Sequence, residues 1–344
     1  MRIAQIAPIV ERVPPSKYGG TERVVSCLTE ELVRRGHDVT LFATGDSITS
    51  ATLSSIYPRA LREAKLKDLY GTNVWTLFNI GKAYERQDEF DVIHDHNGFI
   101  SLPTANLSRT PVISTCHGPF TPENRHIYRE LRRPYLVTIS DAQATVPGLH
   151  YGGTVYNGLD LEPYPYSAES DGYLLFVGRI SPEKGLHTAI QVALNVNMPL
   201  IIAAKLDDTD RAYFTEQVEP YLSDKIRWIG EVDEEERNLL MSRAFCFIHA
   251  AAWREPFGLT LIEAMACGAP VIGTNMGSIP EIVADGKTGF VVNSVEEMID
   301  AVFKIEQISR ADCREHVLNR FTSAHMADGY EALYRKAIAE NQPL

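Results

Sequence analysis

Two carboxylates eight positions apart, Glu255 and Glu263, enclose the segment PFGLTLI at the start of a predicted helix. We expect this helix to begin near Gly258, to end at Gly268 and to lead into an apolar strand. Its first backbone N–H groups would favour an anion such as a diphosphate. Glu263 lies roughly 7 to 8 Å further along the axis, at about 1.5 Å per residue. That offset suits a ribose, whereas Glu255 would face a sugar at the other end.

The surroundings of Glu263 argue against a purely structural role for this acid. A helical carboxylate usually belongs to a solvated polar face, and a loop acid such as Glu255 is usually solvated too. The neighbours of Glu263 leave almost no polar face for it to join: Leu259, Leu261, Ile262, Met265 and Ala266. We therefore keep the ligand-binding interpretation for this pair of acids.

Two cations lie in the short segment VGRISPEKG, directly after a predicted strand. Pro182 stiffens this loop and Gly185 releases it, which would let Arg179 and Lys184 face one point. Arginine offers a planar fork of donors and lysine a point charge, so that together they can neutralise a diphosphate without a metal ion. Loop cations are commonly only solvated, but a position at the carboxyl end of a strand favours binding.

A pair of glycines, Gly19 and Gly20, follows the first predicted strand in the segment YGGTE. They let the backbone approach a ligand, and a helix that begins near Thr21 would favour an anion or sugar oxygens. The segment matches neither the G-x-G-x-x-G fingerprint nor a Walker A loop, which disfavours nicotinamide cofactors and ATP. A tight strand-to-helix turn without any ligand is the alternative.

The elements that would position these residues alternate between short β-branched runs and segments of helical period. Two such series flank a Pro- and Gly-rich linker over 156–172, which could act as a hinge. This alternation predicts an α/β fold of two Rossmann-like, doubly wound domains that face each other across a cleft. We assign 1–160 to the N-terminal domain, 161–325 to the C-terminal domain and 326–344 to a crossover helix. The apolar face of that helix must be buried, and we expect it to pack back on the N-terminal domain.

Composition disfavours several classes of protein. The formal net charge of -12 argues against nucleic acid as a partner, because neutralising phosphates requires a basic face. No apolar run reaches the roughly 18 to 20 residues of a membrane span, and MRIAQIAPIV does not resemble a secretory signal, so we expect a cytoplasmic protein. The five cysteines are widely spaced, which favours free, buried thiols over disulfides or a zinc site.

Together these segments resemble the retaining glycosyltransferases of family 4, which have the GT-B fold. EPFGLTLIE matches the E-x7-E motif, GRISPEKG the diphosphate loop and YGGTE the amino-terminal glycine loop. NGLD, CHGP, EAMACGAPVIGT and GSIPEIV match further motifs of the family. The resemblance spans essentially the whole chain. It implies that the N-terminal domain serves the acceptor and the C-terminal domain the nucleotide-sugar donor.

The resemblance also implies roles for individual residues. Glu263 would hold the ribose and Glu255 the donor sugar, while Gly19 and Gly20 would lie against the donor. Four side chains would carry catalysis: His117, Arg179, Lys184 and Glu255. Three backbone segments would lie near the sugar and the phosphates: Phe257, Gly258 and Leu259. His117 matches the family's histidine beside the donor sugar and the acceptor, although a lone histidine is otherwise more often structural.

Two features lie outside the family pattern. Lys205, in IIAAKLDD, stands where many relatives have a glycine-rich turn, and it would add a third cation near the nucleotide. The DTD segment at 208–210 looks like the metal-binding D-x-D motif of a different glycosyltransferase fold. Acids on a surface turn are usually solvated, so we expect no metal and no other cofactor.

The segment HDHNG offers a further set of polar side chains at a strand end. His94, Asp95 and His96 are consecutive and cannot all point one way, which favours scattered structural roles. Asn97 is then the acceptor contact that we expect from this segment, together with His117.

A basic cluster interrupts this acidic chain in the segment ENRHIYRELRRPY: Arg125, Arg129, Arg132 and Arg133. It could attract a phosphorylated or lipid-linked acceptor, or an anionic membrane surface, which would place the protein at the inner face of a membrane. A solvated helix face is the alternative, because Glu130 interrupts the cluster.

The expected reaction transfers a hexosyl group from a nucleoside diphosphate sugar to a hydroxyl acceptor with retention of configuration. The resemblance implies UDP rather than GDP or ADP as the nucleotide, because UDP is frequent in the family. No carboxylate pair at the roughly 5 Å of a double displacement is evident. The family resemblance implies instead a front-face route in which the departing phosphate takes the acceptor proton. Two alternatives stay open. A nucleotide-sugar epimerase of this architecture would need no acceptor, and a non-catalytic binding module would consume no donor.

Overall fold

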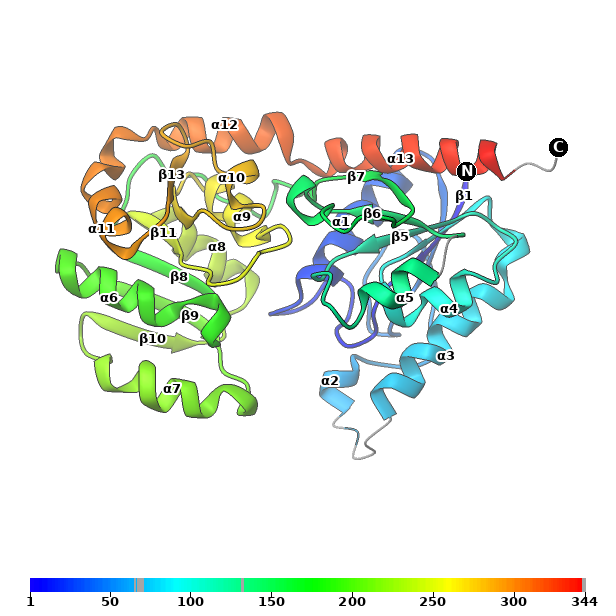
Figure 1. Cartoon of the computed structure of the whole chain (residues 1–344), viewed down its shortest axis with the longest axis horizontal. Coiled ribbons are helices and arrows are strands. Elements are labelled where there is room, and N and C mark those ends of the chain that lie inside the picture. The colour runs from blue at the N-terminus through cyan, green and yellow to red at the C-terminus, as the bar shows by residue number, and fades with distance from the viewer. Residues whose placement is uncertain (65, 67–70, 131–132, 342–344) are drawn as a thin grey trace. The chain divides into compact units, whose positions relative to one another are not determined.

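The structure, a computed structural model, describes residues 1–64, 66, 71–130 and 133–341. The chain divides into two compact units by its internal contacts: unit 1 comprises Met1–Gly158 and Ser323–Leu344, and unit 2 comprises Leu159–Thr322. Each unit is a parallel sheet flanked by helices (Figure 1), and this confirms the predicted fold class of two Rossmann-like domains.

In the described part of unit 1, parallel strands form one sheet in the order β3-β2-β1-β4-β5-β6-β7. The strands are β1 (Arg2–Ile6), β2 (Asp38–Phe42), β3 (Thr52–Ser54), β4 (Val92–Asp95), β5 (Val112–Cys116), β6 (Tyr135–Thr138) and β7 (Tyr151–Thr154). This is the Rossmann order, in which the sheet grows outward from β1 and then, after a crossover, from β4 in the opposite direction. Sequence periodicity misses only β3, a short edge strand whose side chains are not fully buried.

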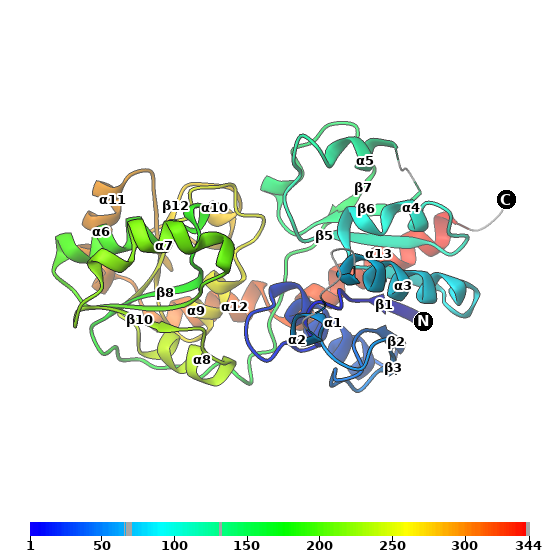
Figure 2. The same ribbon diagram turned by 90° about the horizontal axis from the view of Figure 1, so that it is seen from below.

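Helices cover both faces of this sheet (Figure 2). On one face, α3 (Gly71–Glu85) and α4 (Leu102–Ala105) bury an apolar cluster against alternate strand residues such as Ala4, Ile6 and Ile93. On the other face, α1 (Gly20–Arg34) contacts α13 (Ser323–Glu340), which also contacts β4 and β5. The remaining helices are short: α2 (Leu61–Ala64), α5 (Arg125–Glu130), η1 (Gln87–Glu89), η2 (Gly98–Ile100) and η3 (Asp141–Gln143).

The C-terminal helix α13 belongs to unit 1, as expected from its apolar face. Tyr330 and Tyr334, one turn apart, are fully buried. Arg35, directly after α1, donates hydrogen bonds to Asp328 at 2.7 Å and to Glu331 at 3.3 Å. An apolar stripe and an ionic edge therefore fix α13 on the rest of unit 1.

The strand order of unit 2 corresponds to that of β1 to β6 in unit 1. In this unit the parallel strands run β10-β9-β8-β11-β12-β13. They are β8 (Leu174–Arg179), β9 (Leu200–Lys205), β10 (Ile226–Gly230), β11 (Cys246–His249), β12 (Val271–Thr274) and β13 (Gly289–Val292). The order reverses between β8 and β11, and open sheets of this kind bind ligands beyond the carboxyl ends of the strands at such a switch point.

The helices of unit 2 form two groups. In one group α6 (Leu186–Val196) contacts α11 (Val295–Lys304), and in the other α9 (Leu259–Ala266) contacts α8 (Glu234–Arg243) and α12 (Arg310–Arg320). The shorter helices are α7 (Arg211–Gln217), α10 (Ile279–Ile282), η4 (Pro182–Lys184), η5 (Asp208–Asp210), η6 (Glu219–Tyr221) and η7 (Ile305–Gln307). The core of the unit is made by continuous apolar strand runs, as expected when both faces of a parallel sheet are covered.

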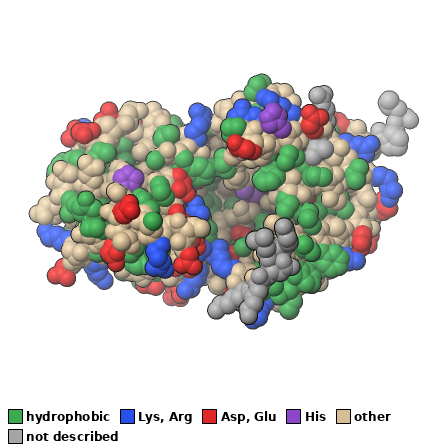
Figure 3. Space-filling view, turned by 60° about the horizontal axis from the view of Figure 1, so that its bottom comes forward, with side chains coloured by type: hydrophobic (Ala, Val, Ile, Leu, Met, Phe, Trp, Pro, Cys, Tyr) green, Lys and Arg blue, Asp and Glu red, His purple; other side chains and the backbone are tan. Residues whose placement is uncertain are grey.

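The surface of unit 1 includes exposed apolar side chains, and the cysteines carry free thiols, as their spacing in the sequence predicts. Helix α3 leaves Val74, Leu77 and Phe78 exposed, and apolar side chains gather on the face of unit 1 that Figure 3 draws. All five cysteines are free, and all except Cys27 are buried. Within the described ranges, no helix is both long enough and apolar enough to cross a bilayer.

Candidate active site

The switch point of unit 2 brings Lys184 and Glu255 together. Lys184 ends η4, which follows β8, and Glu255 lies in the loop after β11. Glu255 Oε2 accepts hydrogen bonds from Lys184 Nζ at 2.6 Å and from Trp253 Nε1 at 3.1 Å. The Lys184 ammonium also lies 5.0 Å from the centre of the Trp253 ring, within reach of a cation–π attraction. Trp253 is a member of this cluster that sequence reasoning missed.

The two loops that carry Lys184 and Glu255 are joined through their backbones. Ala252 N donates to Glu183 O at 2.8 Å. Gly185 adopts a positive φ of 69°, and a Cβ at this position would lie 1.9 Å from the carbonyl oxygen of Ala250. Only glycine therefore permits the close approach that places Lys184 on Glu255.

A second glycine holds the Glu255 backbone from the other side. Gly277 has a φ of 60°, and a Cβ there would lie 2.4 Å from Glu255 O and 2.5 Å from Glu255 N. Ser278 N and Ser278 Oγ each donate to Glu255 O at 3.0 Å, and Oγ lies 2.8 Å from Phe257 O. The GSIPEIV motif therefore contacts the backbone of the loop that carries Glu255 and fixes its position.

His249 is a further neighbour of Glu255 that the sequence did not suggest. It ends β11 and is only 6% exposed. Its Nε2 lies 3.8 Å from Glu255 Oε2 and has no hydrogen-bond partner among the described residues. Burial, assisted by the charge of Lys184, lowers the pKa of His249 to about 3. The imidazole is therefore neutral and adds no positive charge beside Lys184.

The other two predicted cations lie at the neighbouring strand ends. Arg179 in β8 and Lys205 in β9 are register partners, so they lie at the same level of the sheet edge. Each is paired with an acid of its own loop: Arg179 with Glu183, and Lys205 Nζ with Asp207 Oδ1 at 2.5 Å. Arg179 and Lys205 are therefore each held by an acid of their own loop. Of the three predicted cations, Lys184 is the one that contacts Glu255.

Helix α9 begins at the carboxyl edge of the same sheet. Gly258 precedes it with a φ of 80°, and a Cβ at this position would lie 2.7 Å from Leu261 Cδ1. The side chain of Phe257 is buried against Phe321, at a centroid distance of 6.1 Å, so Phe257 could face a ligand only through its backbone. Leu261 N donates to Gly258 O at 2.9 Å, whereas the N–H groups of Leu259 and Thr260 come too early in the helix for an intrahelical acceptor.

Glu263 lies inside α9 and is nearly inaccessible. It is 2% exposed, and its Oε1 accepts from the Tyr164 hydroxyl at 3.1 Å and pairs with Arg237 at 3.2 Å. Sequence reasoning found neither partner, because Tyr164 lies in the predicted linker and Arg237 in the polar helix α8. These contacts hold the carboxylate in place, and its role toward a ribose stays a prediction.

The two glycines of the YGGTE loop in unit 1, Gly19 and Gly20, have different surroundings. A Cβ on Gly19 would lie 2.6 Å from Pro15 Cβ, so Gly19 is required by local packing. A Cβ on Gly20, at the first position of α1, would meet no described atom within 4 Å. Of the pair, Gly20 is therefore the one that leaves open space for a ligand.

Three histidines of unit 1, His94, His96 and His117, form one cluster, so His94 and His96 are not scattered as expected. The ring centroids of His94 and His96 lie 4.0 Å apart with the ring planes tilted by 35°, and His96 Nδ1 lies 2.9 Å from His117 Nε2. The reason is the two-residue period of a strand, which directs positions 94 and 96 to the same face. Asp95 points away and accepts from the Tyr84 hydroxyl at 3.1 Å. Burial lowers the pKa of His117 to about 4, so this ring is neutral near pH 7.

Asn97 is tied into the same strand end. Its Nδ2 donates to Ile6 O at 3.1 Å and to Asp95 Oδ1 at 3.0 Å. Its Oδ1 is buried and has no partner within the described part of the chain. The amide nitrogen thus serves the fold, and only the oxygen of Asn97 is left for the predicted acceptor contact.

The basic cluster is partly structural. Arg133 Nη1 donates to Ser108 O at 3.1 Å, and Arg125 Nε donates to Thr121 O at 3.3 Å. Arg129 is half-buried on α5, and Arg132 lies outside the described residues. Membrane contact through this cluster stays a prediction.

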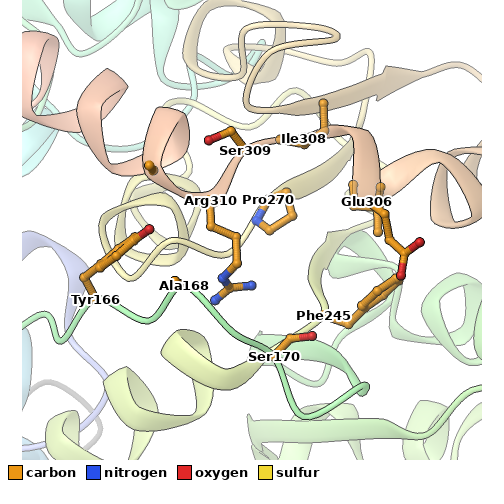
Figure 4. Close-up of a pocket in the computed structure, with 11 residues that line it drawn as sticks. Tyr166, Ala168, Ser170, Phe245, Pro270, Glu306, Ile308, Ser309 and Arg310 are labelled. Atoms are coloured by element: carbon orange, nitrogen blue, oxygen red, sulfur yellow. The ribbon is translucent and has the colours of Figure 1, made fainter.

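A cavity of about 460 Å³ lies in unit 2 (Figure 4). Its lining includes Tyr166, Phe245, Pro270, Glu306 and Arg310, and none of the predicted site residues. The guanidinium of Arg310 donates to the carbonyl groups of three residues, at 2.6 to 2.8 Å: Ser167, Ser242 and Ala244. Arg310 therefore joins backbone segments, and this cavity is not the predicted site.

Comparisons with known proteins concern nearly the whole chain. Residues 18–147 match the family described as Glycosyltransferase Family 4, and residues 165–320 match the family described as Glycosyl transferases group 1. The phosphatidyl-myo-inositol mannosyltransferase of Propionibacterium freudenreichii is 28% identical over 317 residues, which cover 83% of this chain and 80% of that protein. The N-acetyl-alpha-D-glucosaminyl L-malate synthase of Bacillus anthracis is 23% identical over 372 residues, which cover 94% and 96%.

A solved structure agrees with these sequence matches. AviGT4, a glycosyltransferase involved in avilamycin A biosynthesis, is similar with a TM-score of 0.77 and 25% identity, over 99% of this chain and 98% of that one. The two family matches, the relatives and the double Rossmann architecture point the same way. The chain belongs to the family 4 glycosyltransferases, which have the GT-B fold.

Proposed function

We propose that this glycosyltransferase moves a hexosyl group from a nucleoside diphosphate sugar, with UDP as the first nucleotide to test, to a hydroxyl acceptor. The observation that carries the proposal is the grouping of Lys184, Glu255 and the start of α9 at the switch point of one sheet. The names of two relatives, a mannosyltransferase and an N-acetylglucosaminyl-malate synthase, support a hexose as the transferred group.

The proposed donor site combines positively charged groups for the diphosphate with the carboxylate of Glu255 for the sugar. Lys184 and the N–H groups at the start of α9 would bind the diphosphate, on which negative charge grows as the sugar departs. Arg179 and Lys205, at the neighbouring strand ends, would add positive potential. Glu255 would accept hydrogen bonds from hydroxyl groups of the sugar, because an ionised carboxylate is an acceptor only. The carboxylate oxygen that contacts neither Lys184 nor Trp253 is Oε1, and it is the one we assign to the sugar.

The chemical step that we propose retains the anomeric configuration. The bond from the anomeric carbon to the diphosphate oxygen breaks, and the acceptor oxygen bonds to that carbon on the same face. The acceptor proton passes to the departing phosphate. Glu255 needs no proton-transfer role in this step, and no resident metal is required, since cationic side chains offset the charge.

The first experiment identifies the donor. We expect UDP, GDP or ADP, or one of their hexose derivatives, to raise the melting temperature, because a ligand that binds only the folded state stabilises it. The stabilising sugar nucleotide is then incubated with hydroxyl acceptors such as monosaccharides and inositol, and release of nucleoside diphosphate is measured. The anomeric configuration of the product, read by NMR, tests retention.

Variants of the paired charges test the site. Lys184→Met and Glu255→Gln should each lower turnover by about 100-fold or more, in line with the loss of one electrostatic group in an active site. Lys304→Met, which removes an exposed cation on α11, is the matched control and should keep full turnover. Unchanged transfer in Lys184→Met would exclude the proposed role of this lysine.

The same assay separates the alternatives. An epimerase would convert the donor sugar without any acceptor, so a changed nucleotide sugar in an acceptor-free reaction would favour that activity. A binding module would be stabilised by a nucleotide sugar and would consume none. Donor consumption that depends on the acceptor supports the transferase.

A further inference from the structure

A buried chain of hydrogen bonds runs behind His117 in unit 1. His96 Nδ1 lies 2.9 Å from His117 Nε2, and His96 Nε2 lies 2.7 Å from Gln5 Oε1. Gln5 belongs to β1, and both Gln5 and His96 are buried. The imidazole of His117, which follows β5, is therefore connected through a single histidine to an amide on β1, beyond the intervening strand β4.

The chain continues beyond Gln5 to the C-terminal helix. Gln5 Nε2 donates to the Tyr334 hydroxyl at 3.2 Å, and that hydroxyl lies 2.6 Å from His94 Nδ1. His94 Nε2 lies 2.7 Å from Thr115 Oγ1, which in turn lies 2.9 Å from the Tyr330 hydroxyl. Strand register explains the grouping, because Gln5 and His94 are direct partners across β1 and β4.

His94, His96 and His117, the histidines in this chain of hydrogen bonds, each carry one proton on the ring nitrogens. Burial lowers the pKa of His94 and His96 well below the ordinary value, and it lowers that of His117 to about 4. A neutral imidazole donates from one nitrogen and accepts at the other. The chain therefore has two self-consistent proton arrangements, one the reverse of the other, and the orientation of the Gln5 amide selects between them.

The Gln5 oxygen faces His96, and this orientation fixes each donor in turn. An amide oxygen only accepts, so His96 Nε2 carries the proton and His96 Nδ1 is an acceptor. His117 Nε2 must then donate to His96 Nδ1. The remaining nitrogen of His117, Nδ1, is left with a lone pair, and the hydrogen bond found for this ring among the described residues is the one at Nε2.

We propose that Gln5 is a positioning residue that, through His96, holds His117 as the Nε2–H tautomer and so makes Nδ1 an acceptor for a substrate hydroxyl. The inference rests on the proposed function for the identity of that substrate. The pairing of Gln5, His96 and His117 excludes a donor role for His117 at Nδ1. The hydroxyl that this ring recognises must therefore donate its own proton in the hydrogen bond.

The tautomer can be measured without any assay of activity. In uniformly ¹⁵N-labelled protein near pH 7, the two ring nitrogens of a histidine have separate shifts that report which one carries the proton. His117→Gln, at a partly exposed position, assigns the signals of His117. We expect His117 to be protonated at Nε2. Protonation at Nδ1 in the unaltered protein would mean that the chain runs in reverse, and it would overturn the proposal.

A pair of variants tests the role of Gln5. Gln5→Met keeps the length of the side chain and removes the acceptor oxygen, so His96 loses its partner, and the His117 signals should shift toward the Nδ1–H form. Tyr330→Phe removes a buried hydroxyl at the far end of the chain, where it contacts Thr115, and should leave His117 unchanged. An unchanged tautomer of His117 in folded Gln5→Met would contradict the proposal.

The activity readout separates this proposal from the proposed function. With an identified donor and acceptor, Gln5→Met should lower kcat/KM by about tenfold or more, as expected when an active-site histidine is held in the wrong tautomer. Tyr330→Phe should stay within about threefold of the unaltered protein, or ~0.7 kcal/mol, because the lost hydroxyl contacts Thr115 and not His117. If no nucleotide sugar is consumed, the proposed function fails, while the NMR result still decides whether Gln5 sets the tautomer.

Discussion

At the scale of single residues, the Lys184–Glu255 pair links the two halves of the donor site. Each neutralises the other in the structure, at 2.6 Å, and both are largely buried. A bound diphosphate would compete with Glu255 for the Lys184 ammonium and leave the carboxylate free to accept sugar hydroxyls. Binding of the phosphates and binding of the sugar would thereby be coupled through one hydrogen bond.

Glu263 should contribute to donor binding rather than to the chemical step. Glu263→Gln keeps the shape and removes the charge, so we expect the donor KM to rise about tenfold, or ~1.4 kcal/mol, with kcat nearly unchanged. Steady-state kinetics with varied donor concentration measure the split. Glu296→Gln, on the exposed side of α11, is the control. A drop in kcat at constant KM would assign Glu263 to the transition state instead.

Glu22 should make the stability of unit 1 depend on pH. Burial raises its pKa from 4.5 to about 7, and the nearby Glu11 adds to the rise. Between these two values the native state binds a proton that the unfolded state does not, so stability is lost as pH rises through this window. Relative to Glu22→Gln, the unaltered protein should lose on the order of 3 kcal/mol between pH 4.5 and pH 8.

Denaturant unfolding at a series of pH values measures this difference. Glu63→Gln, which changes an exposed acid on α2, should follow the unaltered protein at every pH. Parallel curves for the unaltered protein and Glu22→Gln would show that Glu22 is not protonated in the native state near pH 6.

At the scale of elements, glycines decide how closely the site loops approach each other. Gly185 and Gly277 both have positive φ, and each would collide with the backbone of the β11 loop if it carried a Cβ. The loop that presents Glu255 is therefore held between two positions, 185 and 277, that tolerate no Cβ. Its position depends on shape as much as on hydrogen bonds.

Gly277→Ala should damage the site beyond the cost of its backbone conformation. Its Cβ would lie 2.4 Å from Glu255 O, so the Glu255 loop must shift. Gly286→Ala is a matched control, because Gly286 also has a positive φ, 72°, and its Cβ would meet no described atom within 4 Å. Both variants should lose roughly 1 to 2 kcal/mol of stability from the left-handed conformation, and only Gly277→Ala should also lose transfer activity. Equal activity in the two variants would show that the close contact between Gly277 and the Glu255 loop is not needed for transfer.

Sequence alone predicted most elements and only part of the site. Strands covered on both faces are continuous apolar runs, so β8, β9 and β12 are visible in the sequence, whereas the short edge strand β3 is not. Lys184 and Glu255 could be predicted as neighbours because both follow adjacent strands of a parallel sheet. Their partners Trp253 and His249 could not be predicted, since loop conformation decides which side chains meet.

The histidine cluster could also be predicted only in part from the sequence. Strand period predicts that His94 and His96 share a face, but the Gln5 amide that joins them comes from a strand far away in sequence. Register between β1 and β4 brings Gln5 and His94 to the same level, and register is set by the whole sheet. Hydrogen-bond chains of this kind are therefore visible only once the strands are aligned.

At the scale of the whole molecule, unit 1 is discontinuous and unit 2 is continuous. Both have the same strand order around a switch point, yet only unit 1 requires a segment from beyond the other unit. That segment, α13, buries Tyr330 and Tyr334 against β4 and β5. The stability of unit 1 therefore depends on residues that follow unit 2 in the chain.

Removal of residues 323–344 should unfold unit 1 and spare unit 2. Each buried tyrosine contributes on the order of 150 to 250 Å² of contact, and their loss exposes the histidine chain to water. Hydrogen exchange with mass spectrometry should show lost protection in β4 and β5 and kept protection in β8 and β11. The intact chain is the control, and preserved protection throughout 1–158 of the shortened chain would contradict this dependence.

The position of α13 also dictates an order of events during protein synthesis. The ribosome releases residues 1–158 first, then all of unit 2, and only then the helix that covers β4 and β5. Domains generally fold as units as they emerge, so unit 2 can reach its native state while unit 1 still exposes the surface around Gln5 and His94. The first unit to be translated is thus the last to be completed, and nascent unit 1 is the stage at which a chaperone would have an apolar surface to bind.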